Sequence, residues 1–486
     1  MLFLLSTTQA ASIRALVEVD DTGVRLHRAV IVAEEAAPAA PGELAIRDGE
    51  GRLLASVAVE DARHRSVVGV GEAVVLERAF ALVEAPWPEG ASFVELGGLE
   101  LAPTLAPPSA VAVSESGPDD ERLDIVYLGD GYTADQLDTY AEDVDRISAY
   151  LMSIEPYGAY SGLFNIWRID EASNESGASH YDRGQNDARD TAYGCFYGCG
   201  GIDRLLCCDD QKVLGAVMDQ VPGADGVLVL VNDPTYGGAG GFEYATSYTA
   251  NPTGSLVAAH EIGHSLVGLW DEYSYGQRWQ GSEGPNCALD GDDPPWSAWV
   301  GDQDVDAYTP CSYLDHHRPT QWDCMMNTLQ DDYCAVCREQ AVLAIYEHLP
   351  RIVLSKSPAE TEVRVSEATT FSVEALGPDG GGLSYLWTLD GEVVGTDASL
   401  VVESCASGAL TLEVWDGTPW VRSDPEGKLR DTVTWQLDCS GAASDTGDPR
   451  RPSPAPDCGG CDTGSSPWIG LFAALIVVVP RRRCLQ

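Results

Sequence analysis

Basic residues are few in this sequence. It has 29 Lys and Arg against 76 Asp and Glu in 486 residues, which gives a formal net charge of −47. Proteins that bind nucleic acid or an anionic membrane surface neutralise phosphates with clustered Lys and Arg. The composition therefore argues against nucleic acid as a partner, and it favours the solvated surface of an exported protein.

The C-terminus lacks an apolar run long enough to span a membrane. Its apolar stretch, Trp468 to Val479, has about a dozen residues, whereas a spanning helix needs roughly 20. A Pro/Ser/Asp-rich linker (441–466) precedes it, and Arg481 to Arg483 follow it. This order resembles the tripartite C-terminal sorting tags of myxobacterial surface proteins. The resemblance implies that residues 467–486 are a sorting tag and that the membrane is contacted only there. A plain C-terminal membrane anchor is the alternative.

The N-terminus lacks the basic residues with which a signal peptide begins. It does have a short apolar run and small residues typical of a cleavage site, in MLFLLSTTQAAS. We interpret residues 1–12 as the remnant of a signal peptide. Both ends of the chain therefore predict a secreted or cell-surface protein.

Histidine is also scarce, with eight residues in the chain. By chance, His-Glu-x-x-His should occur in about one such chain in a hundred. The run AHEIGHSLVGLWDEY (259–273) nevertheless contains it, as His260, Glu261 and His264. Helix positions four apart share one face, so both imidazoles can bind a single ion. The motif predicts a Zn²⁺ site with His260 and His264 as ligands and Glu261 as the catalytic base.

A third ligand is expected beyond Gly268, which ends the predicted helix and turns the chain back under the ion. Asp271 is the preferred candidate and Glu272 is the alternative. Tyr273 is a candidate hydrogen-bond donor to the ligands or to the substrate oxyanion. Because the chain is so rich in carboxylates, an ordinary solvated acidic turn is the competing interpretation of both acidic residues.

The residues before the motif predict strands. Val227 to Val231 is a continuous apolar run typical of a buried strand, and FEYATSY (242–248) is interpreted as an edge strand. An exposed strand edge can hydrogen-bond an extended peptide substrate. Between them, a loop contains four glycines that allow another backbone to come close: Gly237, Gly238, Gly240 and Gly241.

Several separated motifs resemble the IgA-peptidase-type metallopeptidases, a family similar to the metzincins. They are DIVYLGDGYT (124–133), FNIWRIDEASNESGA (164–178), LVNDPTYGGAGG (230–241), AHEIGHSLVGLWDEY and CMMNTLQDDYCAVCREQ (324–340). Compared with the metzincin pattern HExxHxxGxxH, Gly268 and Asp271 come one place later, and an aspartate replaces the third histidine. The resemblance implies that Met325 or Met326 forms the methionine turn beneath the metal. A buried methionine that only fills the core is the alternative.

The order of predicted elements indicates an α+β fold. We expect a zincin- or metzincin-like catalytic domain over residues 116–350, because strands and helices there would form a sheet backed by helices. Alternating apolar and polar residues predict an N-terminal β-sandwich over 13–115. Residues 351–440 resemble the immunoglobulin-like repeat of polycystin-type cell-surface proteins, with Trp387 as the core residue, and predict a C-terminal immunoglobulin-like β-sandwich.

Fourteen cysteines fit an oxidising compartment. Cys405 and Cys439 stand alone in the immunoglobulin-like region, which predicts a disulfide between them. Cys334 and Cys337 form a CxxC pair that could join a structural zinc site. No second CxxC with suitable spacing is present, so we expect disulfides in this region instead.

These observations together predict a secreted, surface-tethered and monomeric zinc endopeptidase that acts on protein or peptide substrates. Glu261 would activate a zinc-bound water and then pass the proton to the leaving amine. A hypothesis from another class is a non-catalytic surface adhesin or binding protein that retains the peptidase fold. The intact His260, Glu261 and His264 argue against it.

Overall fold

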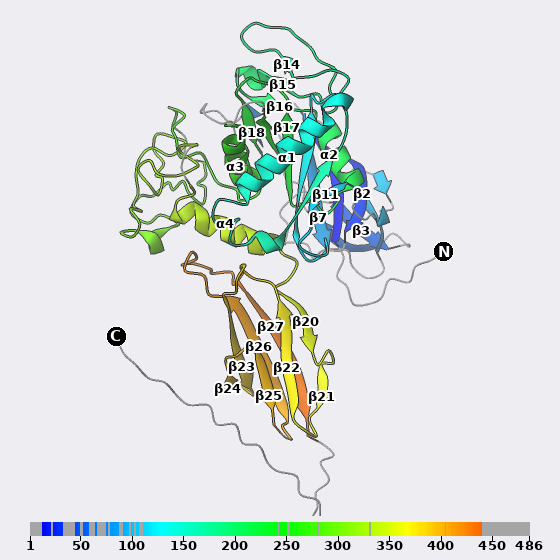
Figure 1. The fold of residues 1–486 in the computed structure, drawn as a ribbon, viewed down its shortest axis with the longest axis vertical. Helices are drawn as coiled ribbons and strands as arrows, with labels where there is room; N and C mark the ends of the chain where they lie inside the picture. The colour runs from blue at the N-terminus through cyan, green and yellow to red at the C-terminus, as the bar shows by residue number, and fades with distance from the viewer. Residues whose placement is uncertain are drawn as a thin grey trace, which may run out of the picture. The chain divides into compact units, whose positions relative to one another are not determined.

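Figure 1 shows the computed structural model of the chain. It describes residues 110–439, apart from 242, 250–252, 279–280, 330–331 and 404, and separate segments between 12 and 105. The chain divides into Met1–Ser440 and Gly441–Gln486. The predicted linker and sorting tag, and residues 1–11 of the predicted signal remnant, lie outside the described residues. Among the helices that the structure describes, none is long and apolar enough to cross a membrane.

A six-stranded sheet organises the region around the His-Glu-x-x-His motif. Its strand order is β11-β13-β12-β17-β19-β18. Four strands run parallel to one another: β12 (Leu123–Asp130), β13 (Phe164–Ile169), β17 (Gly226–Val231) and β19 (Ala245–Tyr248). The two edge strands are antiparallel to their neighbours: β11 (Val111–Ser114) and β18 (Gly238–Gly240). β12 and β17 are buried along their whole length, which explains their nearly continuous apolar sequences.

Helices cover both faces of this sheet. α1 (Leu137–Leu151) and α3 (Gly254–Ser265) share a core with Ile125 and Tyr127 of β12. α2 (Asp210–Gln220) packs in a separate core with Val126 and Leu128, the residues that point to the opposite face of that strand. α4 (Ala335–His348) contributes to the first core. The helix that carries the His-Glu-x-x-His motif, α3, therefore packs directly on the sheet.

Thr133 and Gln136 have the spacing of a capping box, which predicts a helix start, and the structure confirms this start for α1. Thr133 precedes a short 3-10 turn, Ala134–Gln136, and its backbone N–H donates to the side chain of Gln136 at 3.1 Å. This reciprocal capping box satisfies amides that have no partner within the helix. Tyr140, Val144, Ile147 and Leu151 then recur at helical spacing and are buried.

The predicted position of the edge strand is wrong. We expected residues 242–248 at the edge, but β19 lies inside the sheet between β17 and β18. The glycine-rich run before it forms the edge strand itself. Glycine is a poor strand former, so the sequence pattern favoured a loop there. Tertiary packing against α3 overrides that preference.

Two small sheets and a hairpin are described in the N-terminal region. One sheet has the order β10-β2-β1-β7 and the other β4-β3-β8-β9, while β5 pairs with β6. Their bounds are β1 (Ser12–Asp20), β2 (Gly23–Val32), β3 (Leu44–Asp48), β4 (Leu53–Val57), β5 (His64–Arg65), β6 (Val74–Val75), β7 (Arg78–Pro86), β8 (Ala91–Leu96), β9 (Leu99–Leu101) and β10 (Thr104–Leu105). A further sheet, β14-β15-β16, lies between β13 and α2 in the chain, with bounds β14 (Ser179–His180), β15 (Phe196–Tyr197) and β16 (Leu206–Cys207).

Among the described residues between 349 and 439, the regular elements are all strands. One sheet has the order β20-β22-β25 and the other β21-β27-β26-β23-β24. The bounds are β20 (Val353–Ser357), β21 (Glu362–Arg364), β22 (Thr369–Ala375), β23 (Leu383–Leu389), β24 (Glu392–Gly395), β25 (Ser399–Val402), β26 (Gly408–Asp416) and β27 (Arg430–Asp438). Trp387 is fully buried, as expected for a core residue, and its ring stacks on Trp435 at 5.6 Å. The fold is thus mixed α and β, with many sheets and few helices. The domain boundaries stay predictions.

The cysteines give one agreement and one correction. The structure joins Cys405 to Cys439, and it forms three further disulfides, Cys195–Cys208, Cys199–Cys207 and Cys287–Cys311. The expected disulfide pairing of the CxxC cysteines is wrong, because Cys334, Cys337 and Cys324 are free and buried. Cys334 is the N-cap of α4, and its sulfur accepts from the backbone N–H of Cys337 at 3.5 Å. Helix geometry thus turns both thiols to one side.

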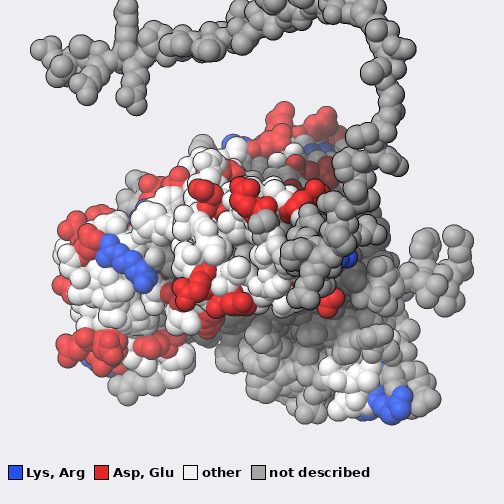
Figure 2. All heavy atoms as spheres, turned by 90° about the horizontal axis from the view of Figure 1, so that it is seen from below, with Lys and Arg blue, Asp and Glu red and all other residues white. Residues whose placement is uncertain are grey.

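The surface carries the acidic character of the sequence. On the face that Figure 2 shows, Asp and Glu side chains are spread widely, and Lys and Arg are few. Such a surface repels phosphate backbones. It offers no basic patch for nucleic acid on the described part of that face.

Candidate active site

The histidines of the motif lie on α3, and the helix ends where the sequence predicted. Gly268 has φ +74°, a conformation that suits glycine, and its N–H donates to the carbonyl of His264 at 3.1 Å. The N–H of Leu269 donates to the carbonyl of Gly263 at 2.9 Å. These two bonds turn the chain back under the helix, so that the segment beginning at Trp270 passes the imidazoles.

The backbone determines which nitrogen of each imidazole is available. Nδ1 of His260 lies 3.0 Å from the carbonyl oxygen of Met325, and Nδ1 of His264 lies 2.6 Å from that of Leu269. A carbonyl only accepts, so each Nδ1 carries a proton and each neutral ring has its lone pair on Nε2. Such carbonyl contacts are the usual support of metal-binding histidines.

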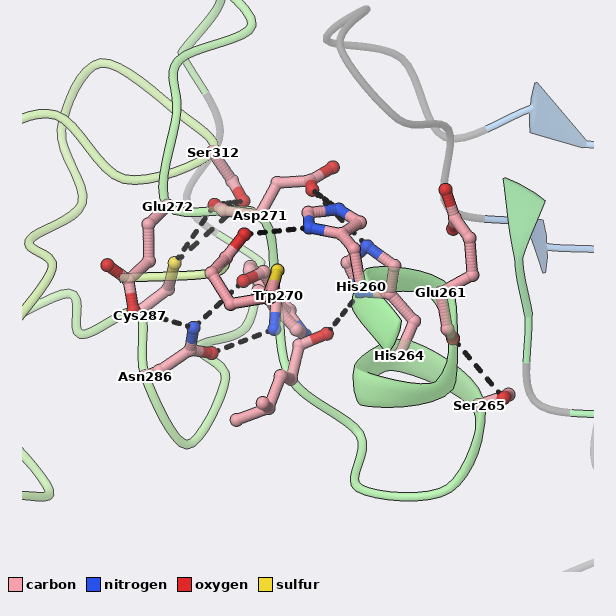
Figure 3. Close-up of polar contacts among 12 residues, drawn as sticks. His260, Glu261, His264, Ser265, Trp270, Asp271, Glu272, Asn286, Cys287 and Ser312 are labelled. Atoms are coloured by element: carbon pink, nitrogen blue, oxygen red, sulfur yellow. Dashed lines mark hydrogen bonds and ion pairs between the residues drawn. The ribbon is translucent and has the colours of Figure 1, made fainter. Parts of the chain in front are cut away.

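Asp271 completes the set of donors. Its Oδ1 lies 3.0 Å from Nε2 of His260 and 3.2 Å from Nε2 of His264, and all three side chains are buried. In Figure 3 the carboxylate of Asp271 reaches toward the two imidazoles. When both rings are neutral, the two Nε2 lone pairs and the carboxylate of Asp271 converge on one point. This arrangement fits a bound cation.

The pKa shifts of His264 and Asp271 arise from the contacts between the histidines and this carboxylate. Burial alone would lower the pKa of His264, but Asp271 outweighs it and raises that pKa to about 9. Burial would raise the pKa of Asp271, but the two histidines hold it well below its usual value. The site therefore stabilises positive charge between the carboxylate and the imidazoles. A divalent metal ion would supply that charge.

Glu261 lies beside this set of donors. Both carboxylate oxygens are buried, and neither has a hydrogen bond within the part of the chain that the structure describes. One ligand atom each of Glu261, His260 and His264 lie within 4.8 Å of one another. Burial raises the pKa of Glu261 to about 7, against the lowering effect of the histidines. A buried carboxylate left unpaired in a polar site is typical of a group that acts on a ligand.

A family comparison agrees with this geometry. Residues 111–304 match the model of the family described as IgA Peptidase M64. This match supports an IgA-peptidase-type metallopeptidase family for residues 111–304. The match covers about two fifths of the chain, since it spans 194 of 486 residues, and it includes α3, Asp271 and Tyr273. The methionines and the free cysteines lie beyond its end.

The comparisons with curated proteins and with solved structures do not point to a function. No curated protein matches the chain. Among solved structures, the chain is similar to the N-terminal four Ig domains of Dscam1 isoform 4.44, with 18% identity over 17% of this chain and 19% of that chain and a TM-score of 0.13. Dscam1 isoform 6.9 gives 17% identity over 17% and 20%, also with a TM-score of 0.13. The chain thus spans about a fifth of the length of these structures.

Glu272, the alternative third ligand, points away from the histidines of α3 (Figure 3). Its Oε1 accepts from the side chain of Asn286 at 3.2 Å and lies 3.1 Å from the sulfur of Cys337. Burial raises its pKa to about 8. The structure thus places Asp271, and not Glu272, at the imidazoles.

The two methionines lie under α3. Both are fully buried, and the carbonyl of Met325 is the one that holds His260. A Cβ built on Gly263 would come within 2.9 Å of the sulfur of Met326, so this sulfur packs on the helix between the two histidines. The methionine turn that the family resemblance implies stays a prediction, because a buried methionine that fills the core would also pack in this way.

Sequence reasoning missed the residue that orients Asp271. The hydroxyl of Tyr275 donates to Oδ2 of Asp271 at 2.6 Å, and the hydroxyl of Ser312 donates to the backbone carbonyl of Asp271 at 2.6 Å. Tyr273, the residue that we selected, has its ring nearly parallel to that of His260 at 6.4 Å, and its hydroxyl is buried. Nothing in the run DEYSY distinguishes the two tyrosines, so no sequence signal would have found Tyr275.

The glycine-rich edge strand touches the active-site helix directly. A Cβ on Gly240 would lie 2.6 Å from Cβ of His264, and a Cβ on Gly238 would lie 3.0 Å from Oε1 of Glu261. Side chains at these positions would push β18 away from α3. The glycines predicted to permit close backbone approach therefore do so against this helix.

Proposed function

We propose that the protein is a zinc endopeptidase with a metzincin-like catalytic domain. The observation that carries this proposal is the convergence of His260, His264 and Asp271 beside the unpaired carboxylate of Glu261. Two imidazoles and one carboxylate are typical of catalytic zinc sites, which keep a further position open. His260, His264 and Asp271 would hold the ion. Bound there, Zn²⁺ would supply Lewis acidity toward water and toward a peptide carbonyl.

Glu261 is the residue that moves protons in this proposal. Its carboxylate accepts a proton from the attacking water and then donates that proton to the leaving amine nitrogen, so one side chain acts first as base and then as acid. Because Glu261 has no hydrogen bond within the described residues, it need not break one to act. Tyr273, next to His260, is the candidate donor to the oxyanion.

The edge strand β18 would bind the substrate. It lies at the end of the sheet and packs against the helix that carries Glu261 and His264. Leu205 bridges β18 at Gly238, and all three residues of β18 are buried, so we propose that an extended peptide reaches the strand at its Gly240 end. A peptide added as a further strand would have its backbone fixed by hydrogen bonds next to the metal site.

The remaining parts of the chain would position this domain outside the cell. We propose that residues 13–115 form a β-sandwich and that residues 351–440 form an immunoglobulin-like β-sandwich. The two sheets around Trp387 and Trp435, and the Cys405–Cys439 disulfide, support the second assignment. The signal remnant, the linker and the sorting tag would make the protein secreted and surface-tethered, and a single chain carries the whole site.

Cleavage of a mixed peptide library, measured together with metal content, tests this function. Wild-type protein should cut internal bonds, and chelation of the metal should stop it. Glu261→Gln and Glu261→Ala should keep the metal and lose roughly 10²- to 10⁴-fold in rate. Glu142→Gln on the exposed side of α1 is the matched control and should behave like wild type. If the wild type and both Glu261 variants give the same digestion pattern, the adhesin hypothesis is the better one.

A further inference from the structure

A second group of metal-binding side chains lies next to the catalytic site but is separate from it. Cys324, Cys334, Cys337 and Glu272 are all buried, and one ligand atom from each lies within 4.8 Å of the others. The sulfurs of Cys324 and Cys337 are 3.5 Å apart, and Oε1 of Glu272 is 3.1 Å from the sulfur of Cys337. We call these four residues the thiolate cluster.

The dimensions of the thiolate cluster suit a tetrahedral zinc ion. With Zn–S bonds of about 2.3 Å and a Zn–O bond of about 2.1 Å, tetrahedral geometry puts two sulfurs about 3.8 Å apart and a sulfur and an oxygen about 3.6 Å apart. Shifts of a few tenths of an ångström would bring the measured pairs to those values. We propose that Cys324, Cys334, Cys337 and Glu272 hold a structural Zn²⁺ ion, with four protein ligands and no open position.

The oxidation state of the cysteines supports this assignment. Within the described residues, eight cysteines form four disulfides, while the three thiols of the cluster touch one another without bonding. A fold that oxidises distant pairs of cysteines would be expected to oxidise adjacent thiols as well. Bound metal is the ordinary protection, because a coordinated thiolate is not available for disulfide exchange.

The surroundings supply what a zinc cluster needs. The backbone N–H of Cys337 donates to the sulfur of Cys334, and the side chain of Asn286 donates to Oε1 of Glu272. Oε2 of Glu272 is buried without a hydrogen bond among the residues that the structure describes. Three thiolates and one carboxylate around Zn²⁺ leave a net charge of about −2 by formal counting. The N-terminus of α4 and the guanidinium of Arg318, 3.5 Å from the carbonyl oxygen of Glu272, offset that charge.

The position of the cluster explains what such an ion would do. Glu272 directly follows Asp271, and Cys324 directly precedes Met325, whose carbonyl holds His260. The N–H of Glu272 donates to the carbonyl of Met326 at 2.8 Å. An ion in the thiolate cluster would therefore tie the third-ligand segment, the methionine turn and the start of α4 together. It would hold both Asp271 and the carbonyl of Met325 in place beside the two histidines.

This inference does not depend on peptidase activity, because the two sites share no ligand. The test uses the purified full chain loaded with Zn²⁺ or Co²⁺, with metal content read by mass spectrometry. Wild type should bind two ions per chain. Cobalt in the thiolate cluster should give thiolate-to-metal charge transfer in the near ultraviolet, which a site of imidazoles and a carboxylate does not give.

Variants then assign each ion. The double variant His260→Ala/His264→Ala should keep one ion and the charge-transfer band. Cys334→Ser should lose one ion and most of the band, while Cys405→Ser/Cys439→Ser, the matched control, should keep both. Because a cysteine variant can fail to fold, Glu272→Gln is the second probe. It preserves shape and should weaken the second ion by roughly 10- to 100-fold.

Disulfide mapping of the three cysteines gives the result that would contradict the proposal. Alkylation of the native, unreduced chain followed by peptide mapping locates any disulfide among Cys324, Cys334 and Cys337. A disulfide there, together with a single bound ion and no charge-transfer band in wild type, would overturn the proposal. Binding of iron rather than zinc in protein purified without added metal would overturn the choice of ion. Loss of peptidase activity alone would bear only on the proposed function.

Discussion

Replacing Tyr275 by phenylalanine tests whether Asp271 is a metal ligand that depends on its orientation. The hydroxyl of Tyr275 donates to Oδ2 of Asp271 at 2.6 Å, while Oδ1 faces the histidines. Tyr275→Phe removes this one hydrogen bond. The ring stays, together with its edge contacts to Tyr273 at 6.0 Å and to Tyr313 at 5.5 Å. The change therefore acts on the carboxylate and leaves the packing intact.

The size of the effect follows from the environment of that bond. Asp271 is fully buried, so water does not replace the lost donor readily. A hydrogen bond to a charged group contributes about 1.5 to 3 kcal/mol. Since about 1.4 kcal/mol corresponds to a factor of ten, the dissociation constant for Zn²⁺ should rise by roughly 10- to 100-fold.

Competition with a chelator of known affinity measures this constant directly. The matched control is Tyr127→Phe in β12, because Tyr127 is fully buried and its hydroxyl has no hydrogen bond within the described residues. That variant should bind Zn²⁺ like wild type. The reasoning fails if Tyr275→Phe leaves the zinc affinity unchanged, or if the two variants weaken it equally.

Three further predictions concern packing, pH and the disulfide. Gly240→Ala should reduce both kcat/KM and stability, because the new Cβ would lie 2.6 Å from Cβ of His264. The loss of stability should be about 1 to 3 kcal/mol. The control is Gly215→Ala in α2, where nothing lies within 4 Å of the new Cβ, and it should stabilise the helix slightly. Burial raises the pKa of Asp124 to about 7, so ionising it disfavours the folded state and wild-type stability should fall as pH rises from about 4 through 7. In Asp124→Asn this loss of stability should be smaller by up to about 4 kcal/mol. Melting curves of both proteins at pH 5 and pH 8 test this, and an equal loss of stability in the two proteins would contradict the assignment. Cys405→Ser/Cys439→Ser opens a disulfide of sequence separation 34 and should destabilise residues 351–440 by about 2 to 4 kcal/mol in denaturant titrations; unchanged titrations would count against the bond.

Local periodicity made much of the site predictable. His260 and His264 lie on one face because the helix repeats every 3.6 residues, and Gly268 ends that helix because it adopts a positive φ. The same kind of reasoning found the capping box at Thr133 and the buried strand β17. These features depend on residues within a few positions of one another, so the sequence carries them directly.

The choice between Asp271 and Glu272 as the third ligand could not be made from neighbouring residues in the sequence. Adjacent residues in an extended segment point to opposite sides, so one of the two had to face the histidines, but the sequence did not say which. The hydroxyl of Tyr275 and the amide of Asn286 decide it, by drawing the two carboxylates in opposite directions. The free thiols were missed for a related reason, because Glu272 meets Cys337 across 65 positions of the chain.

By itself, then, the sequence determined the helix that carries the two histidines, its turn and the chemical nature of the donors, since short-range backbone geometry is enough for these. Tertiary structure alone decided which carboxylate joins the histidines, that the glycines form the edge strand β18, and that three cysteines gather around Glu272. Those outcomes depend on contacts between segments that are distant in sequence, and the packing of the whole domain determines such contacts.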